Sequence, residues 1–416
     1  MMNMKKHPVN WLVLLVAACI LVRVVLIGIA AWVHPNGLGS LYWDIDAKRY
    51  YEVAGLSPQE RAQTLSWDAP LFQEVISLPL HIFSNHAAVP VVFNVAVFVL
   101  SAGLVFVTAG YLFGRKSAWW STALFVSYPS FFVYSILPFP DPLFILLFIA
   151  AVYFLVRLLR ESRFVFALGA GMSAGFCILT KESAVFLPGL FCMVVILTAG
   201  KKYRRAVCAG VLMLVTCSFV VMPSLIHNKL SFGEFTISGK MTKYFKFLHK
   251  VRQRSLPVSV MRGDVSLTAG AIGVPPSNHV FSWLTDYVMS RRQFFFGTGT
   301  ISLMRICGLD TRSLEKIPFR AGAYLSLLQE NGYPWVVFQV MSWIYIIVLY
   351  CLAIGGFITL IVDKQIALAT LFFLCIVYFL GVYFWNFNAR HFTILIPSIS
   401  LISGAFLKGN IDERAL

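Results

Sequence analysis

The chain has 416 residues, of which 59% are hydrophobic and only 12% are charged, whereas about 25% are charged in an ordinary globular protein. Its mean hydropathy of +0.78 is too high for a protein that has to cover a buried core with polar groups. The composition therefore excludes a secreted disulfide scaffold, a disordered chain and a cytosolic enzyme. It predicts an all-α polytopic membrane protein.

The net charge of +16 is dispersed between apolar runs rather than gathered on one face of a soluble domain. This distribution argues against nucleic-acid binding. It favours basic loops that fix the topology and contacts with anionic lipids or phosphates. The eight cysteines include no CxxC pair, so the sequence indicates neither a zinc site nor a disulfide framework.

Ten apolar runs predict membrane-spanning helices, although some are shorter than the roughly 20 residues that a perpendicular helix needs. The first run follows Lys5 and Lys6 and is longer than the apolar core of a signal peptide, so it is predicted to remain as a span. The predicted spans lie near 9–33, 88–113, 117–137, 142–158, 164–180, 183–199, 206–226, 334–361, 366–385 and 392–407.

The short basic loops predict which side of the membrane is cytoplasmic. With the N-terminus inside, the cytoplasmic segments hold 14 Lys and Arg against four Asp and Glu, as the positive-inside rule requires. Two extracytoplasmic loops remain, at about 34–87 and 227–333. We therefore divide the chain into a membrane module (1–226, containing the first loop), the long loop (227–333) and C-terminal helices (334–416).

Two carboxylates, Asp44 and Asp46, follow the first span and lead into a helical pattern. In one interpretation Asp46 caps this helix, because Asp accepts hydrogen bonds from the free N–H groups of a first turn. In the other, a carboxylate beside a bilayer acts as a general base. The residues alone leave both interpretations open.

Further polar residues are predicted on the same side of the membrane. Asp141, between two prolines, is either a helix N-cap or a site residue. Lys181 and Glu182 form a tight hairpin in which they either pair with each other, at little gain in stability, or contribute to a site. Each of these alternatives stays open.

Three cationic or titratable residues complete the set. Arg23 lies inside the first predicted span, where a charge is costly and requires a buried partner or a functional role. Arg390 and His391 lie at the external edge of the last predicted hairpin. They either anchor the chain at the membrane interface or belong to a site.

The order of six short motifs resembles that of the GT-C superfamily of membrane glycosyltransferases. The resemblance is strongest to the RgtA/B/C/D-like branch, which is related to the protein mannosyltransferases and to the aminoarabinose transferase of lipid A. The segments are 46–54 (family pattern D-A-x-x-Y-x-x-x-A), 112–116 with 128–131 (L-F-G-R-x and Y-P-S-F), 140–144 (S-E-x-L-F), 175–181 (G-L-x-x-L-T-R), 227–235 (R-N-x-x-x-F-G-x-F) and 389–397 (A-R-Y-x-x-P-x-x-P).

The sequence departs from these patterns at several positions, of which four bear on the assignment. Asp141 replaces a Glu and Lys181 replaces an Arg, so both changes keep the sign of the charge. His227 replaces an Arg, and Ile394 stands where the first Pro is usual. The resemblance covers residues 1 to about 240 and 375–407, whereas 241–330 matches no family pattern.

The resemblance implies a GT-C-like bundle of about 10 transmembrane helices that moves a sugar, hexosyl or pentosyl, from a polyprenyl-phosphate-linked donor. The acceptor is a hydroxyl on the extracytoplasmic side, and the anomeric carbon is inverted. Asp46, at the family's D-A-x-x-Y position, would be the general base, with Asp44 as the other candidate. One carboxylate suffices, because phosphate leaves readily without a general acid.

The resemblance also implies where the substrates are held. The departing phosphate requires preorganised positive charge, for which the sequence offers Arg390, Lys181, His391 and Arg23. Asp141 and Glu182 would position the acceptor or help to hold a divalent metal, Mg or Mn. Metal dependence stays open, and no other cofactor is predicted.

The predicted partners are the lipid-linked donor, a lipid, glycan or protein acceptor, and membrane lipids, with no nucleic acid. The predicted location is the inner (plasma) membrane, with the site facing the periplasm or exterior. Three alternatives remain. They are a GPI second-mannose type of enzyme, suggested by Trp43–Asp44 and Trp67–Asp68, a glycan polymerase or ligase with a diphosphate-linked donor, and a lipid or solute transporter. The last would show inverted halves with midplane sites, whereas the polar residues here lie at one membrane face.

Overall fold

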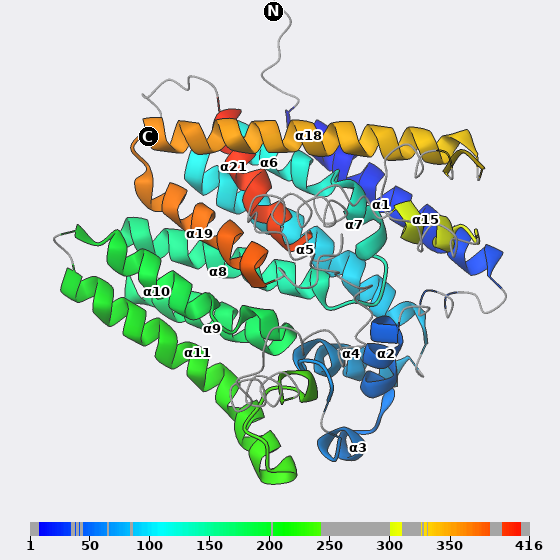
Figure 1. Ribbon diagram of the computed structural model, residues 1–416, viewed down its shortest axis with the longest axis horizontal. Helices are drawn as coiled ribbons and strands as arrows, with labels where there is room; N and C mark the ends of the chain where they lie inside the picture. The colour runs from blue at the N-terminus through cyan, green and yellow to red at the C-terminus, as the bar shows by residue number, and fades with distance from the viewer. Residues whose placement is uncertain are drawn as a thin grey trace, which may run out of the picture.

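The computed structural model describes a helical protein (Figure 1). The long helices pack together in a single bundle. Three short helices lie at one end of this bundle, at the lower right of Figure 1. The all-helical architecture predicted from composition is thus confirmed for the described residues. These are 8–34, 38, 41, 45–64, 66–83, 86–200, 203–242, 300–309, 326, 328–330, 332–382 and 393–408.

Among the described residues, five helices are long and apolar enough to cross a membrane, so the protein is a multi-pass membrane protein. Each contains one of the predicted spans. The long helices are α1 (Pro8–Val33), α5 (Ala88–Phe113), α8 (Asp141–Glu161), α11 (Tyr203–Phe232) and α18 (Tyr333–Val362).

The other predicted spans form shorter or interrupted helices. Two of them begin with a 3₁₀ turn before the α-helix, because prolines at Pro188 and Pro397 favour a new helix start at these points. The shorter elements are α9 (Phe164–Thr180), η2 (Glu182–Ala184) with α10 (Leu187–Leu197), α19 (Ile366–Val382), and η5 (Thr393–Leu395) with α21 (Ile396–Phe406).

The predicted span 117–137 is not one continuous helix. It is divided into α6 (Arg115–Val126) and α7 (Pro129–Tyr134). Tyr128 has an extended backbone (φ −62°, ψ 122°), because a residue before proline is disfavoured in the helical conformation. Pro129 then starts the next helix, where its missing N–H costs nothing.

The first loop folds into three helices, α2 (Ile45–Gly55), α3 (Pro58–Ala62) and α4 (Leu71–Ile82). They lie together at one end of the bundle (Figure 1). The apolar faces of α2 and α4 meet there, with Tyr50 and Phe72 packed edge to face at 5.6 Å between ring centroids. Val97 of α5 and Leu143 of α8 belong to the same buried cluster, so the first loop is anchored on the transmembrane bundle.

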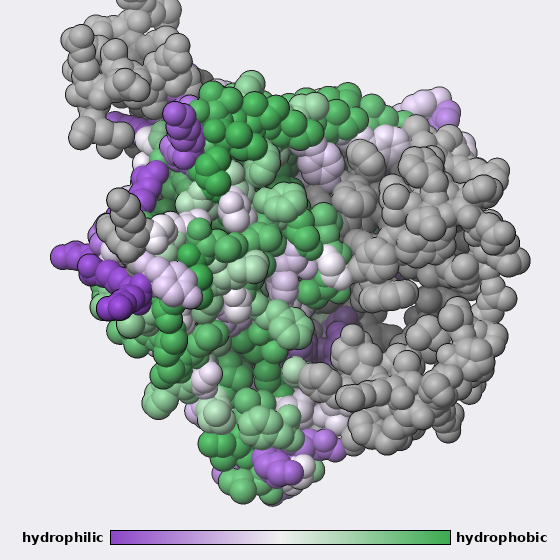
Figure 2. Space-filling view, turned by 60° about the vertical axis from the view of Figure 1, so that its left-hand side comes forward, coloured by the Kyte–Doolittle hydropathy of each residue, from purple (hydrophilic) through white to green (hydrophobic). Residues whose placement is uncertain are grey.

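Close helix packing through small residues joins α9 to α11. Gly171 and Gly175 lie four residues apart on α9 and face the backbone of α11, where the carbonyl oxygens of Met213 and Cys217 lie close. Small residues at this spacing allow two membrane helices to approach each other closely. On the outside of the bundle the described surface is largely apolar, with hydrophilic residues gathered towards its margins (Figure 2), as contact with lipid requires.

We expect Gly171→Ala to destabilise the fold by about 1–3 kcal/mol, because a Cβ atom there would collide with the carbonyl oxygen of Met213. Gly103→Ala is the matched control, since a Cβ atom at this helical glycine meets nothing within 4 Å and alanine is the better helix former. Thermal unfolding of both variants in one detergent measures the difference. Equal losses of stability would contradict the packing argument.

Candidate active site

Asp46 lies in the first turn of α2, and its carboxylate is held by a cation on the same helix. The guanidinium Nη2 of Arg49, three residues later, donates to Asp46 Oδ1 over 2.7 Å. Residues at this spacing lie on one helix face. The side chain of Asp46 is 39% exposed, so its carboxylate is oriented and still accessible.

A second carboxylate completes this array. Arg49 Nε donates to Asp68 Oδ2 over 2.5 Å, and Asp68 is buried. Burial lowers the pKa of Arg49, but the hydrogen bonds and charges of Asp68 and Asp46 outweigh it and raise that pKa above its usual value. Arg49 therefore stays charged and holds both carboxylates in place.

The backbone before Asp68 is fastened by the chain that follows α11. Gly239 N–H donates to the carbonyl oxygen of Ser66 over 2.8 Å, and Lys240 N–H donates to that of Trp67 over 3.0 Å. Asn228 in turn donates to the carbonyl oxygen of Thr236 over 2.8 Å. The segment 236–242 thus positions Asp68, which positions Arg49.

Lys181 and Asp141 form a buried ion pair. Lys181 follows the last residue of α9, and its Nζ donates to Asp141 Oδ1 over 2.7 Å. Asp141 is the first residue of α8, and Pro140 rather than Asp141 occupies the N-cap position. The interpretation of Asp141 as an N-cap is therefore wrong: its carboxylate binds a cation from another helix.

The ion pair and the carboxylate array lie at the same end of the bundle. Leu143, two residues after Asp141, packs in the buried cluster that contains Tyr50 of α2 and Phe72 of α4. In addition, α4 contacts α9, which ends beside Lys181. These contacts bring the helices that carry Asp46 and Asp141 together at one end of the bundle. That Asp46 and Lys181 belong to one site stays a prediction.

Arg23 is fully buried inside α1, where the structure provides it with partners. Its three guanidinium nitrogens donate to Ser135 Oγ (2.6 Å) and to the carbonyl oxygens of Cys19 (2.8 Å) and Phe131 (3.2 Å). The guanidinium carbon also lies 3.9 Å from the ring centroid of Phe98. Arg23 thus ties α1 to α5 and α7, and its binding of a donor phosphate stays a prediction.

Three predicted site residues, Asp44, Arg390 and His391, lie outside the described residues. Glu182 opens η2, and its Oε1 is buried without a hydrogen bond from the part of the chain that is described. Within that part, no three His, Cys, Asp or Glu side chains are grouped as a metal site requires. Arg49 lies between Asp46 and Asp68, so these two carboxylates already share a cation of the protein.

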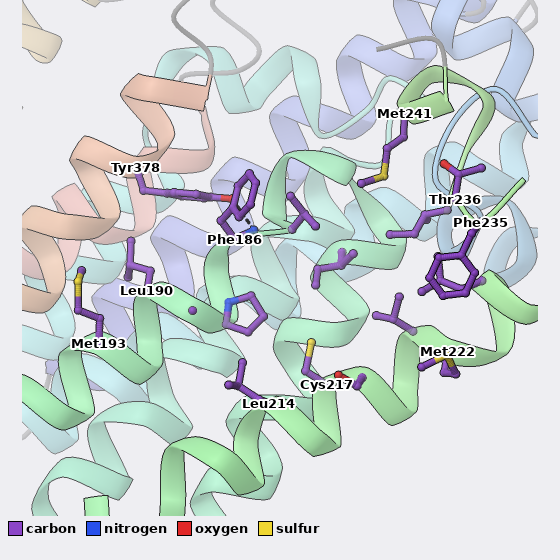
Figure 3. Close-up of a pocket in the computed structure, with 18 residues that line it drawn as sticks. Phe186, Leu190, Met193, Leu214, Cys217, Met222, Phe235, Thr236, Met241 and Tyr378 are labelled. Carbon is purple, nitrogen blue, oxygen red and sulfur yellow. Dashed lines mark hydrogen bonds between the residues drawn. The ribbon is translucent and has the colours of Figure 1, made fainter. Parts of the chain in front are cut away.

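An apolar cavity of about 800 Å³ lies between α10 and α11. Figure 3 shows Phe186, Leu190 and Met193 on one side of it, with Leu214 and Met222 on the other. Tyr378 also lines the cavity. Its hydroxyl donates to the carbonyl oxygen of Ser183 over 2.5 Å and accepts from Phe186 N–H over 3.3 Å. The remaining wall of the cavity includes Thr236, Ile237 and Met241 of segment 236–242, so one segment contacts both the cavity and the backbone beside Asp68.

The sequence interpretation did not assign roles to Arg49 and Asp68. The signal for Arg49 was its position three residues after Asp46, which places both on one helix face. The signal for Asp68 was the Trp67–Asp68 pair, noted only as part of an alternative resemblance. The contact between Asp68 and Arg49 depends on how α4 packs on α2, which no local pattern indicates.

Comparison with known proteins supports the motif-based resemblance. Residues 68–227 match the family model of dolichyl-phosphate-mannose-protein mannosyltransferases. No curated protein sequence matches the chain. The matched range contains Asp68, Asp141, Lys181 and Glu182.

Several solved structures are similar to this chain. The apo oligosaccharyltransferase of Archaeoglobus fulgidus has a TM-score of 0.54 at 14% identity, over 97% of this chain and 50% of that one. AglB of the same organism, in complex with an inhibitory peptide and a dolichol-phosphate, has a TM-score of 0.50 at 12% identity, over 96% and 50%. ArnT from Cupriavidus metallidurans bound to undecaprenyl phosphate has a TM-score of 0.46 at 16% identity, over 97% and 77%.

The chain thus spans about half the length of the oligosaccharyltransferases that it resembles. The family match covers residues 68–227, and the structural likeness extends over 97% of the chain. Residues 68–227 are thus similar to the family of dolichyl-phosphate-mannose-protein mannosyltransferases, and the fold of the chain is similar to that of the Archaeoglobus fulgidus oligosaccharyltransferase.

Proposed function

We propose that the protein transfers a sugar from a polyprenyl-phosphate-linked donor to an acceptor hydroxyl at the extracytoplasmic face of the inner (plasma) membrane. The observation that carries this proposal is the accessible Asp46 carboxylate, oriented by Arg49 and Asp68. It lies at the end of the bundle where segment 236–242 also lines an apolar cavity. A general base at the same end of the bundle as an apolar cavity suits a reaction between a membrane-anchored donor and a hydroxyl.

In the proposed reaction, Asp46 accepts the proton of the acceptor hydroxyl as its oxygen attacks the anomeric carbon. The new carbon–oxygen bond forms opposite the phosphate, and the bond to the phosphate oxygen breaks, so the anomeric configuration is inverted. Arg49 holds the Asp46 carboxylate in one orientation, so less entropy is lost when the transition state forms. Lys181, with Arg390 and His391 as further predicted cations, stabilises the departing phosphate.

The apolar cavity is the proposed site for the isoprenoid chain of the donor. We expect Gly189→Phe to raise the KM for the lipid-linked donor by about tenfold or more, because each CH₂ group displaced from an apolar site costs about 0.8 kcal/mol. Gly189 lines the cavity, and a Cβ atom there meets nothing within 4 Å, so the ring enters the cavity without a backbone clash.

Gly28→Phe is the matched control for this change, because Gly28 on α1 has equally open space and does not line the cavity. Steady-state kinetics in lipid nanodiscs, with a polyprenyl-phosphate sugar as donor, compares the two variants. An unchanged KM in Gly189→Phe would place the isoprenoid chain elsewhere.

Asp68 is proposed as a positioning residue that acts through Arg49. We expect Asp68→Asn to lower kcat by about 10- to 100-fold, as small displacements of reacting groups do, with little change in donor KM. Asp68→Glu is expected to restore part of kcat, since it keeps the charge that holds Arg49. If Asp68→Asn and Arg49→Lys lower kcat additively in a double-mutant cycle, the two do not act together.

The proposed function is tested by mass spectrometry of surface glycans from a deletion strain. Loss of one sugar, restored by the wild-type gene, supports the proposal and names both sugar and acceptor. Release of polyprenyl diphosphate instead of polyprenyl phosphate would favour the polymerase or ligase alternative. Saturable solute uptake into vesicles without a new glycosidic bond would favour a transporter.

A further inference from the structure

A second cavity lies at the opposite end of the bundle from the candidate active site. Asp141 begins α8 at the active-site end, whereas this cavity of about 360 Å³ forms where α8 ends. The end of α10, the start of α11 and the start of α19 complete it. Its lining includes Leu158, Ser162, Val195, Arg205, Ala206 and Ala209.

The lining divides into an apolar part and a polar part. Leu158, Val195 and Ala209 are buried and provide aliphatic surface. Ser162 and Arg205 come from the exposed ends of their helices, and Arg205 is an exposed side chain. A cavity with aliphatic walls and an arginine at its mouth suits an amphiphile that has a negative head.

Arg205 forms no ion pair with a carboxylate in the described part of the chain, and its guanidinium carbon lies 5.5 Å from the ring centroid of Phe164. Arg204 adjoins Arg205 in the first turn of α11, and Arg163 follows Ser162, yet none of the three forms an ion pair there. Two acidic residues described at this end, Glu161 and Asp363, are already paired. Glu161 binds Arg157 and accepts from the Tyr111 hydroxyl over 3.0 Å, and Asp363 binds Lys408.

We infer that this cavity binds an anionic phospholipid, with the headgroup phosphate at Arg205 and the first acyl carbons against Leu158 and Val195. A basic pocket between transmembrane helices, at the level of the headgroups, is the usual setting for such recognition. The site lies at the end of the bundle away from Asp46, so it is separate from the proposed donor site. The cavity accommodates the head and the upper part of the chains, and the rest of the lipid lies along the apolar surface of the protein.

The test uses the purified full-length protein, delipidated and titrated with phosphatidylglycerol, with bound lipid counted by native mass spectrometry. We expect Arg205→Ala to weaken phosphatidylglycerol binding about fivefold, since one basic residue near an anionic headgroup contributes about that factor. Arg205→Lys is expected to retain most of the binding. Ala206→Leu, which fills the cavity without changing the charge, is expected to weaken binding as well.

Lys116→Ala is the control, because it removes an exposed cation at the start of α6 that does not line the cavity. Equal losses of binding in Lys116→Ala and Arg205→Ala would overturn the inference, since they indicate only general attraction to a basic surface. Equal binding of phosphatidylcholine would also overturn it. Complete displacement of phosphatidylglycerol by millimolar inorganic phosphate would indicate a site for free phosphate instead of a lipid.

Discussion

Asp46→Asn is expected to lower the rate of sugar transfer by a factor of about 10² to 10⁴, the range that a general base contributes. The asparagine side chain cannot take the proton of the acceptor hydroxyl, although its oxygen still accepts the hydrogen bond from Arg49. Because Asp46 is 39% exposed, we expect expression, membrane insertion and thermal stability to stay close to those of the wild type. Transfer from a polyprenyl-phosphate sugar in washed membranes measures the rate.

Glu52→Gln provides the matched control on the same helix. Glu52 forms an exposed pair with Lys48 at 3.5 Å, and such pairs contribute little, so this variant is expected to keep wild-type transfer. If Asp46→Asn transfers sugar at the wild-type rate, Asp46 is not the general base. Asp44 is the next candidate, and Asp44→Asn tests it in the same assay.

Breaking the buried pair of Lys181 and Asp141 is expected to destabilise the protein by about 3–5 kcal/mol. In Lys181→Met the carboxylate of Asp141, which is 1% exposed, loses its cation. In Asp141→Leu the ammonium of Lys181 is left buried in the same way. The double variant Asp141→Leu/Lys181→Met is expected to recover most of the loss, because replacing both charges by apolar groups is often neutral.

The same variants separate a structural role of Lys181 from a role at the donor phosphate. Thermal unfolding reports the stability, and transfer activity is measured on the fraction that remains folded. If Lys181 also stabilises the departing phosphate, the double variant regains its stability and stays inactive. If the double variant regains both stability and transfer activity, the ion pair has only a structural role, which is to hold α8 against α9.

Much of the helix pattern was predictable because it depends on local chemistry. The apolar runs near 88–113 and 164–180 correspond to α5 and α9, since an uninterrupted apolar segment in a membrane has to satisfy its backbone internally. The prediction failed at 117–137, where Pro129 divides the run. The sequence shows this proline, but the segment is apolar throughout, and we therefore predicted one continuous helix.

The candidate site was predictable only in part. Asp46 was identified from a motif, and its partner Arg49 lies one helical turn away, within reach of a local argument. Asp68 was missed because it meets Arg49 only when α4 packs on α2 through Tyr50 and Phe72. The partner of Lys181 was likewise unforeseen, because Asp141 precedes it by 40 residues.

The sequence by itself determined that this protein lies in a membrane, which family it resembles and where most of its helices run. These properties follow from hydropathy and from short motifs, both of which are local along the chain. Only the tertiary structure decided which partner each charge has. Asp68 pairs with Arg49 and Asp141 with Lys181, whereas Arg23 donates hydrogen bonds to backbone carbonyl groups. A buried charge requires a nearby partner, and the folding of the helices, not their order in the chain, determines which partner is near.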